Sequence, residues 1–260
     1  MDTISCLTVT RAARLESLER AIRAFARQTW ADRELIIVHD EGAALQSSIE
    51  SLAGQWPSCA IRVHGEAADR PLGALRNVSV SLARGSLVCQ WDDDDLYHPE
   101  RLERQARCLT SHGADFCFLT DQMHLFAPTG EMFWDDWTVE VPPMHLIQGT
   151  LLGRRDRLGR YPEIRRGEDT PMLLDLVGRG ARIAELRDAG WLYVYVFDGQ
   201  NAFDLGHHAG ISAWKRRRKE ALLAGGDELL RRLREHEWPV RHVFMPFEGG
   251  RVHVVPAESS

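Results

Sequence analysis

Short apolar runs alternate with helix-like segments through the first 121 residues, and few folds are compatible with this pattern. Each run has the length of a buried strand. Between the first two, Leu15, Leu18, Ile22 and Phe25 recur at three- and four-residue steps, as on an amphipathic helix. We predict a mostly parallel α/β sheet flanked by helices. The predicted strands are residues 4–10, 34–40, 60–64, 86–91 and 115–120, and the further helices are residues 45–53, 72–83 and 99–112.

The pattern changes after Asp121, where the sequence predicts a mixed arrangement of strands and helices. Pro128, Thr129 and Gly130 separate two apolar arms, as in a hairpin, and Gly249 with Gly250 do the same near the C-terminus. Three segments are expected, namely residues 1–121, 122–210 and 211–260. The predicted elements after the first hairpin are strands at 145–155, 182–186 and 192–197, and helices at 168–178, 212–224 and 227–237.

Composition excludes several classes of protein. A net charge of -6 argues against a nucleic-acid binder that works by bulk electrostatics, so no nucleic-acid partner is expected. No apolar stretch approaches the roughly 20 residues of a membrane span, and no signal peptide is visible, which favours a cytoplasmic protein. The five cysteines are odd in number and widely spaced, so we expect reduced thiols in the core rather than disulfides or a zinc site.

The segment "CQWDDDDLYHPERL" places four consecutive carboxylates, residues 92–95, between an apolar run and a helix start. Their mutual repulsion raises the cost of ionising all four unless a cation or hydrogen-bond donors offset it. A solvated acidic loop with one Asp capping the next helix is the alternative. The basic run "KRRRK" at residues 215–219 is likewise open between a solvated helix face and contact with an anionic acceptor or a membrane surface.

Ligands of parallel α/β sheets bind outside the carboxyl ends of the strands, so the residues that follow the first, second and fourth strands are expected to share one rim. Acidic groups there can hold a divalent cation that bridges to a nucleoside diphosphate, and oxygen ligands favour magnesium or manganese. The groups concerned are Thr10 with Arg11, then His39, Asp40 and Glu41, then Asp92 to Asp95.

Three blocks of the chain resemble the family 2 glycosyltransferases with the GT-A fold. They are "ISCLTVTRAARLESLERAIRAFARQTWADRELIIVHDE", "PLGALRNVSVSLARGSLVCQWDDDDLYHPERLERQ" and "RRGEDTPMLLDLVGRG", and the resemblance covers about residues 4–201. It implies a Rossmann-like central sheet, a nucleotide-sugar donor and an inverting transfer. Residues 1–121 would then form the nucleotide-sugar-binding half, residues 122–210 the acceptor and catalytic-base half, and residues 211–260 a C-terminal appendage of helices and a hairpin.

The resemblance also assigns roles to residues on the donor side. Thr10 and Asp40 would contact the base and Arg76 the nucleotide, with Arg11 beside Thr10 as a further donor contact. The family usually has Asp or Asn where this chain has His39. The Asp-x-Asp motif would fall on Asp92 and Asp94, with Asp94 on the metal and Asp93 on the ribose or a metal-bound water, while Asp95 would cap the next helix.

The third block implies the general base. The family places it on the Asp of a Glu-Asp pair, here Glu168 and Asp169, and an inverting transfer needs one carboxylate to remove the acceptor proton. The family often has a histidine where this chain has Asp198, and His207 and His208 follow shortly after. Each of these three could complete the metal site, although surface histidine is the alternative.

Together these residues predict a metal-dependent inverting glycosyltransferase that uses a nucleoside diphosphate sugar, with a UDP-sugar favoured and Mn²⁺ or Mg²⁺ as cofactor. The acceptor hydroxyl could belong to a saccharide, a lipid-linked saccharide, a peptide or a small molecule, and the enzyme could be peripheral at a membrane. Trp134, Trp137 and Trp191 are candidates for stacking on a sugar, with core packing as the alternative. A non-catalytic binding module of the same fold is the competing function. A nucleotidyltransferase is disfavoured because "TRAARLES" has no glycine-rich, lysine-containing loop.

Overall fold

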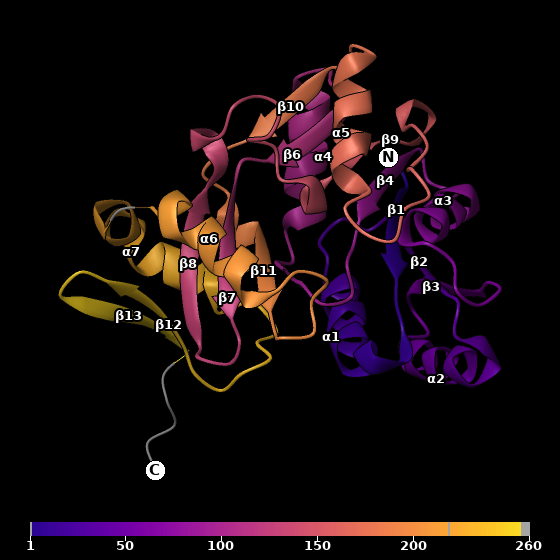
Figure 1. Ribbon diagram of the computed structural model, residues 1–260, viewed down its shortest axis with the longest axis horizontal. Coiled ribbons are helices and arrows are strands. Elements are labelled where there is room, and N and C mark those ends of the chain that lie inside the picture. Colours follow the sequence, from indigo (N-terminus) through magenta and orange to yellow (C-terminus); the bar gives the residue numbers. More distant parts are fainter. Residues whose placement is uncertain (1, 218, 256–260) are drawn as a thin grey trace.

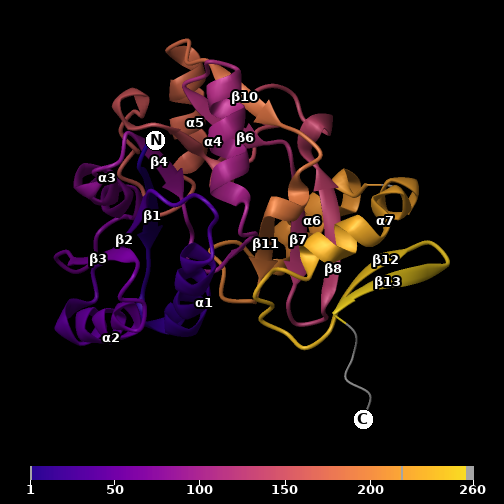
Figure 2. The ribbon, with the colours of Figure 1, turned by 180° about the vertical axis from the view of Figure 1, so that it is seen from behind.

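The computed structural model describes residues 2–217 and 219–255, and within them the strands form two sheets of seven and six strands (Figures 1 and 2). The larger sheet has the order β10-β6-β9-β4-β1-β2-β3. Its strands are β1 (Ile4–Val9), β2 (Arg33–His39), β3 (Ala60–Gly65), β4 (Leu87–Gln90), β6 (Phe116–Leu119), β9 (Leu152–Arg154) and β10 (Ile183–Leu186). The predicted α/β fold class and the five strands predicted for the first half are confirmed.

The larger sheet is parallel except at β9, which lies antiparallel between β4 and β6. The prediction of one strand over residues 145–155 is wrong for most of its length, because only the last part pairs as β9 and residues 148–150 form a 3-10 turn. Thr150 explains the turn: its hydroxyl donates to the carbonyl of Ile147 at 2.6 Å and accepts from the backbone N–H of Leu119 at 3.0 Å. These bonds compete with a strand ladder.

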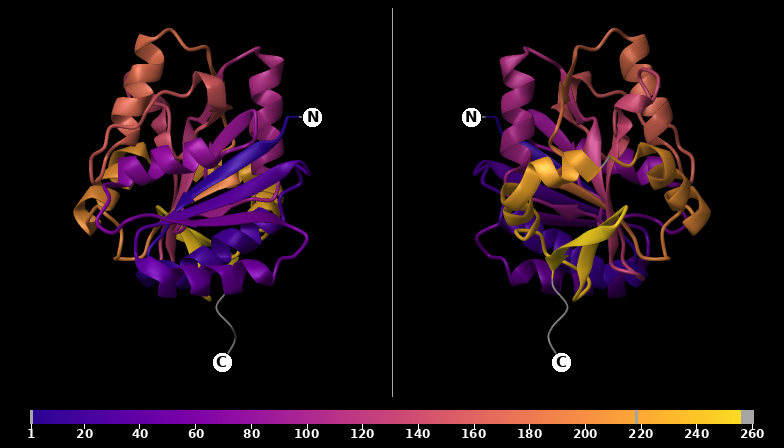
Figure 3. Two further views of the ribbon diagram at one scale, coloured as in Figure 1. Left: turned by 90° about the vertical axis from the view of Figure 1, so that its right-hand side faces the viewer. Right: turned by 90° about the vertical axis from the view of Figure 1, so that its left-hand side faces the viewer.

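Helices cover both faces of the larger sheet (Figure 3). One core joins β1 and β2 to α1 (Leu15–Ala26), α2 (Gly42–Gly54) and α4 (Arg101–Ser111) through residues such as Cys6, Ile22 and Leu102. The other core joins the opposite face to α3 (Leu72–Leu82) and α5 (Asp169–Gly178) through residues such as Ile36 and Leu173. The period of two along each strand sends alternate side chains to the two cores. All five cysteines lie in the described part of the chain and none forms a disulfide.

The smaller sheet has the order β13-β12-β8-β7-β11-β5 and lies beside the larger one (Figure 1). Both predicted hairpins are confirmed, and Gly130 and Gly249 occupy their turns with φ of 73° and 85°, a region that favours glycine. Its strands draw on all three predicted segments of the chain. They are β5 (Leu96–Tyr97), β7 (Asp121–Phe126), β8 (Glu131–Asp136), β11 (Tyr193–Phe197), β12 (Val243–Phe247) and β13 (Gly250–Val255).

The prediction of one helix over residues 212–224 is wrong, because α6 (Leu205–Lys215) ends at the first residue of the basic run and α7 (Lys219–Leu233) begins at its last residue. Lys215 is buried and its ammonium group donates to Glu140 at 2.6 Å, while Arg217 pairs with Asp188 at 2.8 Å. These two side chains therefore do not form a solvated helix face, which was one of the two alternatives for the run, and Arg218 lies outside the described residues. No helix in the described part of the chain is long and apolar enough to cross a membrane.

Candidate active site

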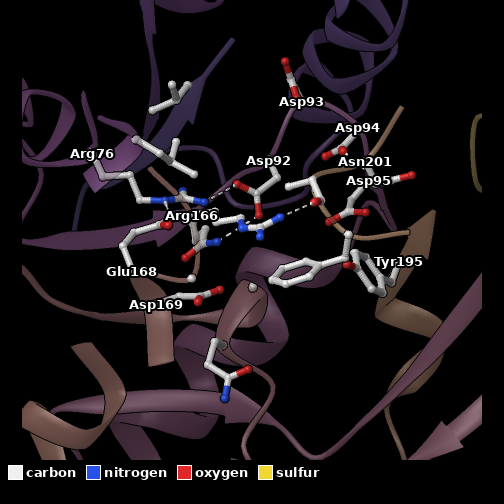
Figure 4. Close-up of a pocket in the computed structure, with 18 of the residues that line it drawn as sticks. Arg76, Asp92, Asp93, Asp94, Asp95, Arg166, Glu168, Asp169, Tyr195 and Asn201 are labelled. Atoms are coloured by element: carbon white, nitrogen blue, oxygen red, sulfur yellow. Dashed lines mark hydrogen bonds and ion pairs between the residues drawn. The ribbon is translucent and has the colours of Figure 1, made fainter. Parts of the chain in front are cut away.

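A cavity of about 600 Å³ opens at the carboxyl ends of β1, β2 and β4, where the strand order of the larger sheet places its ligand site. The loops after these three strands form one side of it. The rest is formed by the start of α5, the segment before β9, the chain around the start of α6, and residues of α3, β7 and β11 (Figure 4). The predicted site residues that line it are Thr10, Arg11, Asp40, Glu41, Arg76, Asp92, Asp93, Asp94, Asp95, Glu168, Asp169 and His207.

Asp92 and the start of α5 are connected by one buried arginine. Arg76 donates from Nη2 to Asp92 Oδ1 at 3.0 Å and from Nε to Glu168 Oε1 at 2.5 Å, and Gln90 donates to the other oxygen of Asp92 at 2.9 Å. Burial opposes the charge of Arg76, but Asp92 and Glu168 outweigh it and raise the arginine pKa well above its ordinary value. The structure thus pairs Arg76 with carboxylates on two sides of the cavity.

Asp93 and Asp94 are two adjacent carboxyl groups in the wall of the cavity. Thr10 donates its hydroxyl to Asp93 at 2.6 Å, and Arg14 pairs with Asp94 while lying 3.7 Å from Asp93. Burial raises the pKa of Asp93 to about 8, with the charge of Asp94 adding to the rise and Arg14 opposing it. Burial also raises the pKa of Asp94. The wall therefore holds more potential negative charge than Arg14 neutralises.

Asp95 does not cap the next helix, so that prediction is wrong. Its carboxylate is buried and accepts hydrogen bonds from the hydroxyl of Tyr193 at 2.5 Å and the backbone N–H of Val196 at 3.0 Å. Helix α4 begins at Arg101 after Glu100, which makes no side-chain cap. Because β5 follows Asp95 directly and pairs with β11, the carboxylate is turned toward β11.

Asp169 is the first residue of α5, and its carboxylate is almost free of protein partners. Its one hydrogen bond to the described residues is from the adjacent N–H of Thr170 at 2.9 Å. Burial raises the pKa of Asp169, Arg76 lowers it, and Glu168 and Asp92 raise it further. A carboxylate with an available oxygen and a raised pKa is suited to accept a proton.

The side of the cavity formed by the loops after β1 and β2 contains Thr10, Arg11 and Asp40. Arg11 donates to the carbonyl of Gln200 at 3.1 Å, and Asp40 accepts from the backbone N–H of Arg70 at 2.8 Å. His39 does not line the cavity. Its ring is fully buried on β2 and shares a hydrogen bond with Gln46 at 2.7 Å, so its side chain is directed away from the rim.

The two adjacent histidines of α6 point in different directions. His207 lines the cavity, is exposed and stacks on Phe203 with ring centroids 4.4 Å apart. His208 is fully buried and shares a hydrogen bond with His124 at 3.0 Å on the other side of the helix. The prediction of His208 as a metal ligand is therefore not supported. Asp198 accepts from the backbone N–H of Gln200 within its own turn.

Only one of the three tryptophans proposed for sugar stacking lines the cavity, and it is Trp137. Trp134 is buried and donates its indole N–H to Asp121 at 2.7 Å. Trp191 is buried with its ring edge against His98, at a centroid distance of 4.5 Å. The core-packing alternative holds for these two residues.

Sequence reasoning missed several residues of the wall, above all Arg14, Arg166 and Asn201. Asn201 donates to Asp94 at 3.3 Å and to the carbonyl of Val196 at 2.8 Å. Arg11 and Arg14 are three residues apart, at the two ends of a short 3-10 turn, and both donate to the carbonyl of Gln200. That spacing was a usable signal for Arg14, but no comparable signal points to Asn201.

The donor set fits a divalent cation that arrives with its ligand. Among the described residues, no group of three or more His, Cys, Asp or Glu side chains could hold a metal alone. Asp92 and Asp94 nevertheless supply hard carboxylate oxygens, and Asp94 Oδ1 makes no hydrogen bond to the described residues. Mg²⁺ and Mn²⁺ are commonly held by one or two carboxylates together with substrate phosphates. A cation would also offset the charge that raises the pKa of Asp93.

Comparison with known proteins gives consistent results. The family model described as "Glycosyl transferase family 2" matches residues 5–140, just over half of the chain. TarS from S. aureus, residues 1–349 in complex with UDP, superposes with a TM-score of 0.61 at 16% identity, covering 90% of this chain and 79% of that one. The UDP-GlcNAc complex gives 0.61 at 17%, covering 89% and 65%. The mannosyltransferase PcManGT from Pyrobaculum calidifontis, in complex with GDP-Man and Mn²⁺, gives 0.60 at 13%, covering 90% and 72%. No curated protein matches the sequence.

Proposed function

The chain belongs to glycosyl transferase family 2 and has the GT-A fold, and we propose that it is a metal-dependent inverting glycosyltransferase. It would move a sugar from a nucleoside diphosphate sugar to an acceptor hydroxyl. The observation that carries the proposal is the position of Asp169 in the same cavity as Asp92, Asp93 and Asp94, with Arg76 joining the two acidic groups through Asp92 and Glu168.

In this reaction the acceptor oxygen bonds to the anomeric carbon as the bond from that carbon to the phosphate oxygen breaks. Asp169 accepts the proton of the acceptor hydroxyl, which its raised pKa and available oxygen favour. Glu168 remains paired with Arg76 and fixes the start of α5, so that Asp169 keeps its position. Attack opposite the leaving diphosphate inverts the configuration of the sugar.

On the donor side, Thr10, Arg11 and Asp40 would contact the nucleoside, and Asp93 the ribose or a metal-bound water. Asp92 and Asp94 would hold Mn²⁺ or Mg²⁺, and the bound cation would stabilise charge on the departing diphosphate. His207, which lines the cavity, would contact the metal or the diphosphate. A UDP-sugar is our favoured donor. Because the similar structures contain either UDP compounds or GDP-Man, both bases belong in the test.

The first experiment is a thermal-shift panel of UDP, GDP, ADP and CDP, each with and without Mn²⁺. A ligand that binds only the folded state raises the apparent stability by about 2.7 kcal/mol at a concentration 100 times its Kd. We expect one of these nucleotides to give a shift that depends on the metal. No metal-dependent shift with any of them would overturn the proposed donor and cofactor.

The second experiment separates an enzyme from a binding module. Asp169→Asn should lower turnover by about 10²- to 10⁴-fold, measured as nucleoside diphosphate released from sugar nucleotides with methyl glycosides or water as acceptors. Nucleotide binding should stay near that of the wild type. Asp175→Asn is the matched control, because Asp175 is on the same helix and pairs with Arg179 at the surface. Unchanged turnover in Asp169→Asn would exclude Asp169 as the base, and no turnover in the wild type would favour a binding module.

A further inference from the structure

The cations around the cavity differ in what they bind. The arginines among its described lining residues are Arg11, Arg14, Arg70, Arg76, Arg165 and Arg166. Four of them pair with carboxylates: Arg14 with Asp94, Arg70 with Glu66, Arg76 with Asp92 and Glu168, and Arg165 with Asp69. Arg11 and Arg166 instead donate to main-chain carbonyls of the same segment, at Gln200 and Ala202. Those two guanidinium groups are the ones with charge not matched by a carboxylate of the described residues.

Arg166 precedes Asp169 by three residues and reaches across the cavity toward the segment that carries Asn201 (Figure 4). Its Nη1 donates to the carbonyl of Ala202 at 3.3 Å, and its guanidinium carbon lies 5.8 Å from the ring centroid of Phe203. The side chain is exposed. A 3.3 Å hydrogen bond from arginine to a neutral carbonyl is weaker than a bond in which the acceptor is a charged phosphate, so an anion can displace it.

We propose that Arg166 binds the diphosphate of the donor. The inference rests on the proposed function and adds to it a residue to which the family resemblance assigns no role. Ala202 is adjacent to Asn201, which donates to Asp94 at 3.3 Å, so the guanidinium lies near the carboxylate proposed for the metal. The acidic wall repels a diphosphate, and Arg14 and Arg76 are already paired with that wall. Arg166 supplies an additional positive charge from the loop before α5, whereas the acidic wall follows β4.

The guanidinium group also suits this ligand by shape. Its planar N–H donors can bind two phosphate oxygens at once, whereas an ammonium group binds phosphate only as a point charge. Arg11 contacts the same segment from the loop after β1, where its Nη2 donates to the carbonyl of Gln200 at 3.1 Å. The two arginines therefore both contact residues 200–202, and Arg166 is the one that lies three residues from Asp169 in the sequence.

The test measures Kd by calorimetry in Mn²⁺ for the nucleoside diphosphate that gives the largest thermal shift, and for its parent nucleoside. Arg166→Ala should weaken diphosphate binding about ten- to a hundredfold and leave nucleoside binding within threefold. Arg166→Lys should give an intermediate loss. Arg165→Ala is the matched control, because it removes the same charge from the neighbouring residue, whose side chain pairs with Asp69 at 2.8 Å. It should change both affinities less than threefold.

The outcomes separate this inference from the function on which it rests. Equal diphosphate affinity in Arg166→Ala and the wild type overturns the role of Arg166 while the proposed function stands. An equal loss in Arg165→Ala and Arg166→Ala also overturns it, because overall loop charge would then explain the effect. Equal weakening of nucleoside and diphosphate binding indicates a general distortion and overturns the contact. A wild type that binds no nucleoside diphosphate overturns both proposals.

Discussion

Each of the two sheets has a cluster of polar side chains, and the two clusters differ in whether they face a cavity. At the rim of the larger sheet lies an acidic cluster, Asp92, Asp93 and Asp94, which faces the cavity and is held by Arg14, Arg76 and Thr10. Under the smaller sheet lies a histidine cluster, made of His124, Asp135, His208 and Ser212, in which the exposed fraction is 2% or less for every member.

The histidine cluster is bonded within itself. His124 shares hydrogen bonds with Asp135 and with His208, each at 3.0 Å, and Ser212 donates to Asp135 at 2.9 Å. These residues come from β7, β8 and α6, so the cluster fixes α6 against the smaller sheet. The cavity-lining His207 belongs to the same helix, and its position therefore depends on this contact.

The difference shows how to distinguish a ligand site from a structural polar cluster. Carboxylates that face a cavity with excess like charge are unfavourable until a cation or a ligand joins them. Buried groups that bond to one another without access to a cavity contribute to folding, and in the histidine cluster only Asp135 Oδ1 and His208 Nε2 make no hydrogen bond to the described residues. We therefore expect substitutions in the two clusters to affect stability in different ways.

The largest effect is expected from the same substitution made in each cluster. Asp135→Ala should lower the free energy of unfolding by about 3–5 kcal/mol, because it removes the buried carboxylate that pairs with both His124 and Ser212. Asp94→Ala should cost less than about 1 kcal/mol without ligand, since the loss of the Arg14 pair is offset by relief of carboxylate repulsion. Urea unfolding with a chelator present measures both.

Asp94→Ala should at the same time abolish the metal-dependent thermal shift with nucleotide, while Asp135→Ala, where it remains folded, should retain it. If Asp94→Ala destabilised the ligand-free protein as strongly as Asp135→Ala, the acidic cluster would be structural and the contrast between the clusters would be wrong.

Much of the fold could be predicted because strands and amphipathic helices leave local patterns. The five strands of the first half and both hairpins follow from apolar runs and turn residues. The two wrong elements depend on distant contacts. Thr150 turns the chain before β9 through a bond from Leu119, and the basic run leaves the helix where Lys215 becomes buried against Glu140. Neither partner is close in sequence.

The positions of Asp92, Asp94 and Asp169 at the cavity could be predicted, because these residues follow the end of a strand or begin a helix. The directions of side chains were not predictable. His207 and His208 are neighbours, yet His124 fixes the rotation of α6 so that only the first faces the cavity. Arg166 was missed because the partner that it reaches, Ala202, depends on how two distant loops approach each other.

A second prediction concerns pH and the acidic cluster. The pKa of Asp93 is raised in the fold to about 8, above its unfolded value, so the folded state binds the extra proton between these values. Stability of the metal-free protein should therefore fall as pH rises toward 8, by about 2 kcal/mol between pH 6 and pH 8 from this group. Asp93→Asn should remove this loss. Urea unfolding at the two pH values, with a chelator, measures it.

Added Mn²⁺ and nucleotide should also reduce the loss in the wild type, because a bound cation favours the ionised carboxylate. The prediction for Asp93 would be wrong if the wild type and Asp93→Asn had the same change in stability between pH 6 and pH 8.

The smallest expected effect has the opposite sign and comes from the histidine cluster. Burial lowers the pKa of His208 to about 3, with His124 and His207 adding to the decrease, so His208 is neutral in the fold and takes up a proton on unfolding below its usual value of 6.5. Its contribution to stability should be present above pH 6.5 and fall by about 1.5 kcal/mol between pH 6.5 and pH 5. His208→Asn, which can keep a polar atom near the position of Nδ1, should reduce the slope in this range.

His98 and His236 also have lowered pKa values, about 3 and about 4, mainly through burial, so the variant should remove only part of the loss on the acid side. His207→Asn is the matched control, since it changes the exposed neighbour and should alter the slope far less. An equal change in both variants would mean that the burial of His208 does not set the pH response of the histidine cluster. A slope that falls in His208→Asn alone, beside a loss toward pH 8 that falls in Asp93→Asn alone, would show that the two clusters respond to protons independently.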